Sequence, residues 1–194
     1  TTPDAIPEKP AEFKNTGKFD TAKAVAKERV AKPNVVEGKV WFIEKDDIDT
    51  DMIFHNRYLT ITDIKEMGQY SFDNLKGYED FAKRANPTDI VVTTKNFGAG
   101  SSRQQAVDCF KSLGISCIIA ESFGAIYERN AINAAMPILT YKPGQMQELG
   151  LKDGDTISVN FETGEIVNKT SGKTVKINPF YPVQLEIYQN DGLL

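Results

Sequence analysis

In the middle of the chain, short apolar runs typical of strands alternate with longer stretches whose apolar residues have helical spacing. Three short apolar runs predict strands, and the second is continuously apolar, as in a strand covered on both faces. These runs are residues 89–94, 115–120 and 137–141. Two stretches with helical spacing, 101–113 and 122 to about 134, separate them. The alternation predicts a parallel βαβαβ unit with right-handed crossovers.

The two predicted helices carry end signals. Ser101 and Gln104 have the spacing of a capping box, and Gly114 is a natural C-terminal cap. Ser122 is a candidate cap for the second helix. These signals place the start of the first helix at Ser101, directly after a glycine-rich turn.

Shorter elements flank this unit. Residues 39–43 predict a strand, and residues 62–84 predict short helices, with Thr62 and Asp63 as caps for the first. After Gly150, three short strands separated by glycines predict a β-meander. A last short helix follows them. The predicted meander strands are 156–161, 165–168 and 173–177, and the predicted helix is 183–189. The fold class is therefore α/β.

Residues 1–36 differ from the rest of the chain. They contain four prolines, many charges and few large apolar residues, although 19–31 has the composition of a short helix. No continuous apolar stretch of a secretory signal occurs there. We expect an extension or linker over 1–36 and one domain over 37–194.

Composition excludes several classes of function. The net charge of −4 disfavours a nucleic-acid binder, and no apolar run approaches the ~18 residues of a membrane span. Cys109 and Cys117 are predicted to be buried free thiols, which suits a reducing compartment such as the cytoplasm. Two cysteines and one histidine cannot supply a whole zinc or iron–sulfur site, so we expect no metal bound by this chain alone.

The glycine-rich turn at 96–106 carries the candidate chemistry. It contains Gly98, Gly100, Ser101 and Arg103 just after a predicted strand. A helix start with free N–H groups binds anions, and an arginine grips a carboxylate with two parallel hydrogen bonds. A serine there acts as a base only if its alkoxide is stabilised. These residues predict a site for a carboxylate-bearing substrate or a phosphate.

Two other interpretations of this turn remain open. The first is a purely structural turn, in which the glycines allow positive φ, a serine caps the helix and Arg103 pairs with Asp108 or a loop acid. The second is a dinucleotide fold, because Gly98 and Gly100 begin its fingerprint and Glu121 stands where a ribose-binding acid is expected. Arg103 occupies the third glycine position, which opposes that second interpretation.

Several separated motifs resemble the swivelling C-terminal domain of the aconitase superfamily. The resemblance spans roughly residues 37–194, and in size and motif order it extends to the free-standing small subunits of 3-isopropylmalate dehydratase and homoaconitase. The motifs are Asp49-Thr50-Asp51, Tyr58-Leu59, Asn-Phe-Gly-Ala-Gly-Ser-Ser-Arg-Gln-Gln-Ala (96–106), Ser122-Phe123-Gly124-Ala125-Ile126, Arg129-Asn130 and Pro137-Ile138. Ala99 and Gln104 depart from the cysteine and glutamate that are common in the family.

The resemblance implies a three-layer β/β/α swivelling domain and a hydro-lyase. Such enzymes dehydrate and rehydrate hydroxy di- and tricarboxylates with a 4Fe–4S cluster carried by a large subunit, over which the small subunit closes. The implied partners are that large subunit, in a heterodimer or heterotetramer, and a small hydroxy-carboxylate. Close alternatives are hydratases for citrate, citramalate or dimethylmalate, and an alternative of another class is a nucleotide-binding or regulatory α/β module.

The resemblance also implies residue roles. Ser101 would remove the proton α to a carboxylate, Arg103 would bind a substrate carboxylate, and Ser102 would support that contact. Asp51 would orient these residues, and Asn96, Gly98 and Gly100 would shape the turn that carries them.

The loop after Tyr58-Leu59 resembles the family's specificity loop. Homoaconitase-like members carry Arg-Thr there, whereas this chain has the uncharged pair Thr60-Ile61, which favours a smaller or apolar γ-substituent. Arg57 lies close enough along the chain to reach in, or is simply solvated. His55, in the same loop, is predicted to be structural or solvated.

Overall fold

The computed structural model describes residues 32–193, and these form one compact unit from Pro33 onward. Residues 1–31 of the extension expected over 1–36 lie outside the described residues, and these include the candidate helix at 19–31. Within the described residues, the first strand begins at Val35 rather than at residue 39, because residues 35–39 pair with a strand of the meander.

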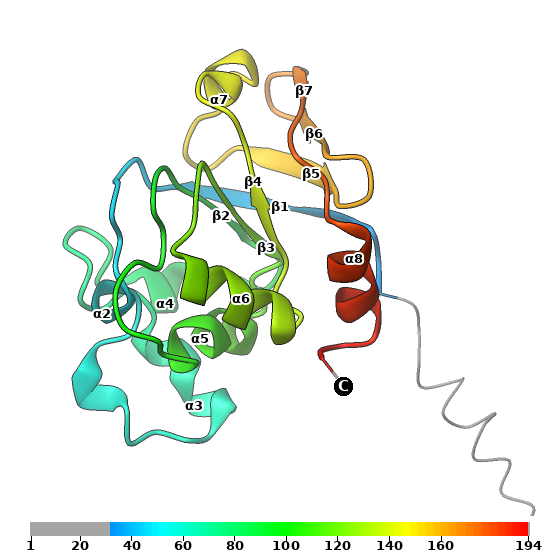
Figure 1. The fold of residues 1–194 in the computed structure, drawn as a ribbon. Helices are drawn as coiled ribbons and strands as arrows, with labels where there is room; N and C mark the ends of the chain where they lie inside the picture. The colour runs from blue at the N-terminus through cyan, green and yellow to red at the C-terminus, as the bar shows by residue number, and fades with distance from the viewer. Residues whose placement is uncertain (1–31, 194) are drawn as a thin grey trace, which may run out of the picture. The chain divides into compact units, whose positions relative to one another are not determined.

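The unit contains seven strands in one curled sheet with helices around it (Figure 1). The strands are β1 (Val35–Phe42), β2 (Ile90–Val92), β3 (Cys117–Ala120), β4 (Ile138–Thr140), β5 (Thr156–Asn160), β6 (Glu165–Asn168) and β7 (Thr174–Lys176). The helices are α2 (Thr50–Ile53), α3 (Ile64–Met67), α4 (Phe81–Arg84), α5 (Gln105–Leu113), α6 (Ala125–Asn133), α7 (Gln145–Glu148) and α8 (Pro182–Gln189), with 3₁₀ turns at η1 (Asn56–Tyr58) and η2 (Gly68–Tyr70).

The strand order is β4-β3-β2-β1-β5-β6-β7. β1 to β4 are parallel, with registers such as Trp41 opposite Val91 and Val91 opposite Ile118. β5, β6 and β7 form an antiparallel meander that joins the sheet through β1. The predicted βαβαβ core and the predicted meander are both confirmed.

Alternating side chains of the parallel strands face two separate hydrophobic cores. Trp41, Val91 and Ile118 belong to the core under α5 and the shorter helices. Their neighbours Val40 and Ile119 belong to the other core, beneath the meander and α8. The parallel strands thus form the middle of three layers, with α5, α6 and the shorter helices before them on one face and β5–β7 with α8 on the other (Figure 1).

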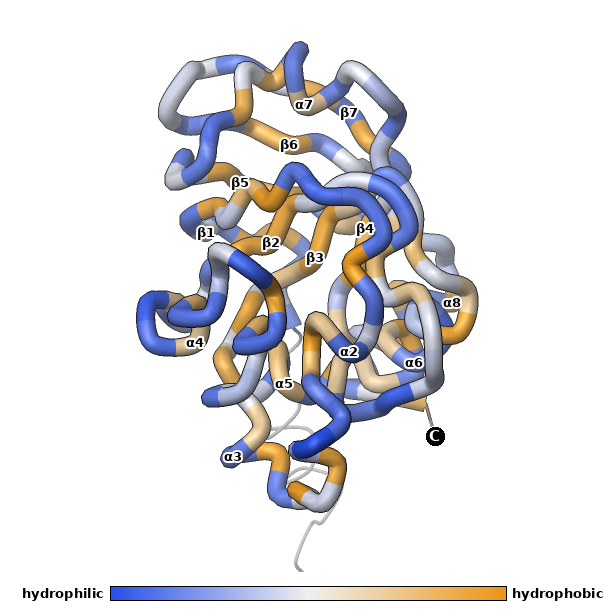
Figure 2. The backbone as a smooth tube through the Cα atoms, turned by 90° about the vertical axis from the view of Figure 1, so that its left-hand side faces the viewer, coloured by the Kyte–Doolittle hydropathy of each residue, from blue (hydrophilic) through white to orange (hydrophobic). Residues whose placement is uncertain are grey.

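Hydrophobic residues concentrate in the central strands, and the connecting loops at their ends are mostly hydrophilic (Figure 2). Burying large side chains such as these stabilises the fold by roughly 1.5–3 kcal/mol each. Cys109 and Cys117 are buried and free, as predicted, and burial raises the pKa of the Cys109 thiol to about 12. Neither thiol is available as a nucleophile near neutral pH.

Candidate active site

Three chain segments meet beyond the carboxyl ends of β1, β2 and β3. The Gly98 N–H donates to the Ile48 carbonyl at 2.7 Å, and the Thr50 N–H donates to the Ala99 carbonyl at 2.9 Å. On the other side, the Phe97 N–H donates to the Ser122 carbonyl at 3.0 Å. The glycine-rich turn is therefore clamped between the Asp-Thr-Asp turn and the start of α6, at the sheet edge where α/β proteins bind ligands.

The glycines are required by this clamp. Gly98 has a φ of 83° and Gly100 a φ of 98°, in the region that side chains disfavour. A Cβ atom at Gly98 would overlap the ring of Tyr127. Asn96, with a φ of 58°, anchors the start of the turn through its side chain to Asp47 Oδ1 at 2.9 Å and through its N–H to Ser122 Oγ at 2.8 Å.

The predicted start of the first helix is wrong. α5 begins at Gln105, and no side-chain cap bonds its N-terminus. The Gln104 side chain donates forward to Asp108 Oδ1 at 3.2 Å instead of reaching back to Ser101, so the capping box does not form. Ser101 and Arg103 consequently lie in the loop before α5, outside its first turn.

The predicted cap of the second helix is also wrong. The N-cap of α6 is Gly124, and the Ser122 hydroxyl accepts the Asn96 N–H instead. Other end signals are confirmed: the Asp63 side chain accepts the Lys65 N–H at the start of α3, and Gly114 ends α5 in the left-handed conformation.

The loop at 101–103 nevertheless presents donors to solvent. Ser101 and Ser102 are exposed. Within residues 32–193, the backbone N–H groups of residues 101–103 donate to no acceptor. Successive free N–H groups attract anions whether or not a helix starts there.

Arg103 is held by one end of its guanidinium. Nη1 donates to Asp51 Oδ1 at 2.8 Å and to the Phe54 carbonyl at 3.0 Å, and the side chain is only 14% exposed. No residue in the described part of the chain accepts from Nε or Nη2. Three of the five guanidinium N–H groups thus remain for a ligand, enough for two parallel bonds to a carboxylate.

Asp51 is itself fixed by three neighbours. Its carboxylate accepts the Asn56 N–H at 3.0 Å and the Asn74 side chain at 3.2 Å, in addition to Arg103. His55 Nε2 lies 4.0 Å from Asp51 Oδ2. The hydrogen bond from Arg103 is the largest cause that lowers the pKa of Asp51, so the pair is ionised at neutral pH.

One neighbour of the site lay outside the predicted site residues. The Asn130 side chain, on α6, donates to Ser102 Oγ at 3.1 Å. Asn130 belongs to one of the motifs of the family resemblance, but only the fold brings it across 28 residues to Ser102.

The Arg57 side chain lies against Asp73 and Tyr58. Its guanidinium lies 3.6 Å from Asp73 Oδ2 and 4.9 Å from the ring centre of Tyr58. The Tyr58 hydroxyl also donates to Asp73. The adjoining Thr60 is exposed and Ile61 half-buried, and the Gln105 side chain donates to the Leu59 carbonyl at 3.4 Å. The loop over Thr60-Ile61 therefore lies beside the start of α5 with its nearby arginine already paired.

The geometry does not favour a dinucleotide site. In that fold the glycine turn runs directly into a helix whose N–H groups hold the pyrophosphate. Here α5 starts at Gln105, and Tyr127 fills the space over Gly98. Among residues 32–193, no group of three His, Cys, Asp or Glu side chains lies close enough to hold a metal ion.

Comparisons with known proteins show the family of the chain. A family model described as the aconitase C-terminal domain matches residues 34–144. The isopropylmalate/citramalate isomerase small subunit of Methanocaldococcus jannaschii is 40% identical over 83% of this chain and 92% of its own. The 3-isopropylmalate dehydratase small subunit of Clostridioides difficile is 41% identical over 77% of this chain and 88% of its own.

A homoaconitase and a solved structure are also similar. The methanogen homoaconitase small subunit of Methanothermobacter thermautotrophicus is 36% identical over 82% of this chain and 89% of its own. The crystal structure of 3-isopropylmalate dehydratase from Methanocaldococcus jannaschii superposes with a TM-score of 0.74 at 34% identity, covering 82% of this chain and 90% of that one.

Proposed function

Because the chain belongs to the aconitase C-terminal domain family, we propose that it is the small subunit of a hydro-lyase of the 3-isopropylmalate dehydratase type. The observation that carries this proposal is the loop at 101–103. It combines an exposed serine, free backbone N–H groups and an arginine with three unused donors. This set of groups suits a substrate that carries a carboxylate next to an acidic C–H bond.

In the proposed mechanism, Arg103 binds a substrate carboxylate through Nε and Nη2. Asp51 and the Phe54 carbonyl hold Nη1. The fixed guanidinium orients the carbon next to that carboxylate toward Ser101. The Ser101 alkoxide then removes the proton from that carbon, and the free N–H groups stabilise the alkoxide. Ser102, held by Asn130, supports the carboxylate contact.

A 4Fe–4S cluster is expected on a large subunit, where its open iron would act as a Lewis acid on the leaving hydroxyl. The relatives are named small subunits, which supports a large-subunit partner. The site residues act from one side of the substrate only, so turnover requires both polypeptides.

The loop before α3 supports a substrate with an uncharged γ-substituent. Thr60-Ile61 carries no charge, and the Arg57 guanidinium is paired with Asp73 at 3.6 Å. A distal carboxylate would therefore meet no free cation from this loop. Isopropylmalate or a methyl-substituted malate fits better than a tricarboxylate with a long chain.

The buried free cysteines are compatible with a reducing compartment, and we propose the cytoplasm. No helix within residues 32–193 has the length and apolar character to cross a membrane.

The test is reconstitution with the cluster-loaded large subunit from the same organism. We expect no turnover from either subunit alone. The mixture should turn over 3-isopropylmalate at least ~10-fold faster than homocitrate or homoisocitrate, because both tricarboxylates bring an unpaired charge to the loop. Turnover by the isolated chain would refute the shared site. A preference for homoisocitrate would refute the assignment of substrate.

A further inference from the structure

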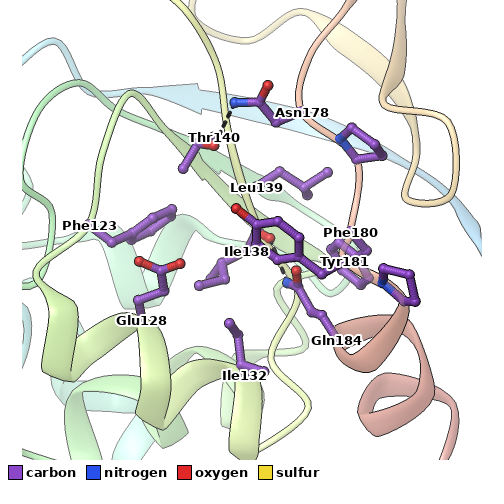
Figure 3. A pocket seen from close by; sticks show the side chains of 12 residues that line it. Phe123, Glu128, Ile132, Ile138, Leu139, Thr140, Asn178, Phe180, Tyr181 and Gln184 are labelled. Atoms are coloured by element: carbon purple, nitrogen blue, oxygen red, sulfur yellow. Dashed lines mark hydrogen bonds between the residues drawn. The ribbon is translucent and has the colours of Figure 1, made fainter.

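A cavity of about 370 Å³ lies between α6, β4 and the segment that leads into α8 (Figure 3). Its walls are mostly apolar and come from Phe123, Ile132, Ile138, Leu139, Phe180 and Tyr181. Most of its polar groups are satisfied internally: Asn178 donates to Thr140 Oγ1 at 2.9 Å, and Gln184 donates to the Ile138 carbonyl at 3.0 Å.

Glu128 is the exception. Its side chain projects from α6 into the cavity (Figure 3). No residue in the described part of the chain forms an ion pair or a side-chain hydrogen bond with it. A carboxylate at an apolar wall is stabilised by a cation that arrives with its own apolar stem, as lysine and arginine do.

Exposed apolar side chains adjoin the cavity. Tyr181 lines it and is 70% exposed, and Val183, in the first turn of α8 between two lining residues, is 66% exposed. A second hollow of about 250 Å³ lies along α6; Glu128 and Ile132 line both hollows, and Arg129 lines only the second. Apolar side chains gathered around hollows of this kind mark protein-binding surfaces.

This surface is continuous with the candidate active site. The Phe123 ring lines the cavity, while the backbone of Phe123 is paired with Phe97 of the glycine-rich turn. The same helix that carries Glu128 carries Asn130, which donates to Ser102. The segment that leads into α6 thus joins the cavity at Phe123 to the turn that carries the exposed serines.

We propose that the groove formed by these two hollows docks the cluster-bearing large subunit, through a segment that presents a bulky apolar side chain beside a lysine or arginine. The inference rests on the proposed function, which supplies the partner. Glu128 receives the basic group, and the aromatic and aliphatic walls receive the apolar one. The groove fixes the partner over Ser101 without contacting the substrate.

The experiment measures the Kd of the full chain for the purified large subunit by titration calorimetry, and turnover at saturating large subunit. Glu128→Lys and Tyr181→Asp are the test variants, and Glu186→Lys is the control because Glu186 is exposed on α8 and does not line the groove. We expect the Kd to rise at least tenfold in each test variant and to stay within twofold in the control. Turnover at saturation is expected to be unchanged in all three.

An unchanged Kd in both folded test variants overturns the inference. If the wild-type chain binds the large subunit without turnover, the proposed function fails while the comparison of Kd values still decides the groove. A second copy of this chain is the alternative occupant: sedimentation velocity would then show a dimer of the wild-type chain that Tyr181→Asp dissociates, with an unchanged Kd for the large subunit.

Discussion

At the scale of single residues, Arg103 uses only one nitrogen of its guanidinium for contacts within residues 32–193. Nη1 is engaged by Asp51 and the Phe54 carbonyl, and the remaining nitrogens face no acceptor within residues 32–193. A lysine has a single nitrogen and no planar fork, so it cannot offer a carboxylate two parallel hydrogen bonds while it also holds Asp51. The residue is therefore suited to hold a carboxylate in one orientation.

Arg103→Lys is predicted to impair substrate binding and turnover together. Losing a bidentate charged contact worth about 1.5–3 kcal/mol corresponds to a fall in kcat/KM of roughly 10–100-fold. Steady-state kinetics of the reconstituted enzyme measure this, with Arg84→Lys as the control, because Arg84 is exposed on α4 and lines neither hollow of the groove. Equal kcat/KM values for Arg103→Lys and wild type would remove Arg103 from the site.

Ionisation of Asp51 makes the free energy of unfolding depend on pH. Because Arg103 lowers the pKa of Asp51 in the folded chain, ionised Asp51 adds stability above the ordinary carboxyl value of about 4. That contribution is lost as pH falls through the lowered value in the folded state. We expect the free energy of unfolding, measured in urea between pH 6 and pH 2.5, to fall more steeply for wild type than for Asp51→Asn.

The size of this difference is limited by exposure. The Asp51 side chain is 40% exposed, so solvent screening holds the effect to about 1 kcal/mol or less. Parallel pH profiles for wild type and Asp51→Asn would show that the ion pair with Arg103 does not contribute.

At the scale of elements, the glycine-rich turn depends on two backbone clamps and on close packing at Gly98. A side chain there meets the Tyr127 ring and also needs a left-handed conformation, whereas a Cβ at Gly100 comes only within 3.6 Å of Thr50 Oγ1. The two glycines thus share a conformation but differ in available space.

Gly98→Ala is predicted to lower the free energy of unfolding by about 2–4 kcal/mol, from overpacking plus backbone strain. Gly100→Ala should cost only the strain, about 1 kcal/mol. Chemical denaturation of both variants compares them directly. An equal loss in the two variants would contradict the packing role assigned to Tyr127.

Periodicity predicted the elements whose signals lie within a short stretch of sequence. The parallel strands, the meander and the C-terminal glycine of α5 follow from apolar runs and turn residues that the sequence displays directly. The start of α5 does not, because the Gln104 amide is drawn to Asp108 and the Arg103 side chain to Asp51. The spacing of Ser101 and Gln104 fits a capping box whether or not the box forms. Spacing alone therefore could not show that Gln104 bonds Asp108 instead.

Long-range pairs of the site were less accessible to sequence reasoning. Family resemblance pointed to Ser101, Arg103 and Asp51, but Asn130 meets Ser102, and Asp73 engages Arg57, only through the fold. Neither pair has a sequence spacing that predicts contact.

At the scale of the whole described unit, the residues that stabilise the fold and the residues of the candidate site lie at different places on the sheet. Its two cores lie on opposite faces of the parallel strands, and the candidate site lies beyond their carboxyl ends, where the loops after β1, β2 and β3 meet. We propose that the exposed serines and free N–H groups form one side of the substrate site. The large subunit would complete it, and catalysis would then be a property of the assembly.

The most direct test of this account is Ser101→Ala in the reconstituted enzyme. Ser101 is exposed, so the variant should fold and bind the large subunit normally. Removing a general base is predicted to lower kcat by roughly 10²–10⁴-fold with the Kd for the large subunit unchanged, while Ser158→Ala on β5 keeps full turnover. Wild-type kcat in Ser101→Ala would contradict the account.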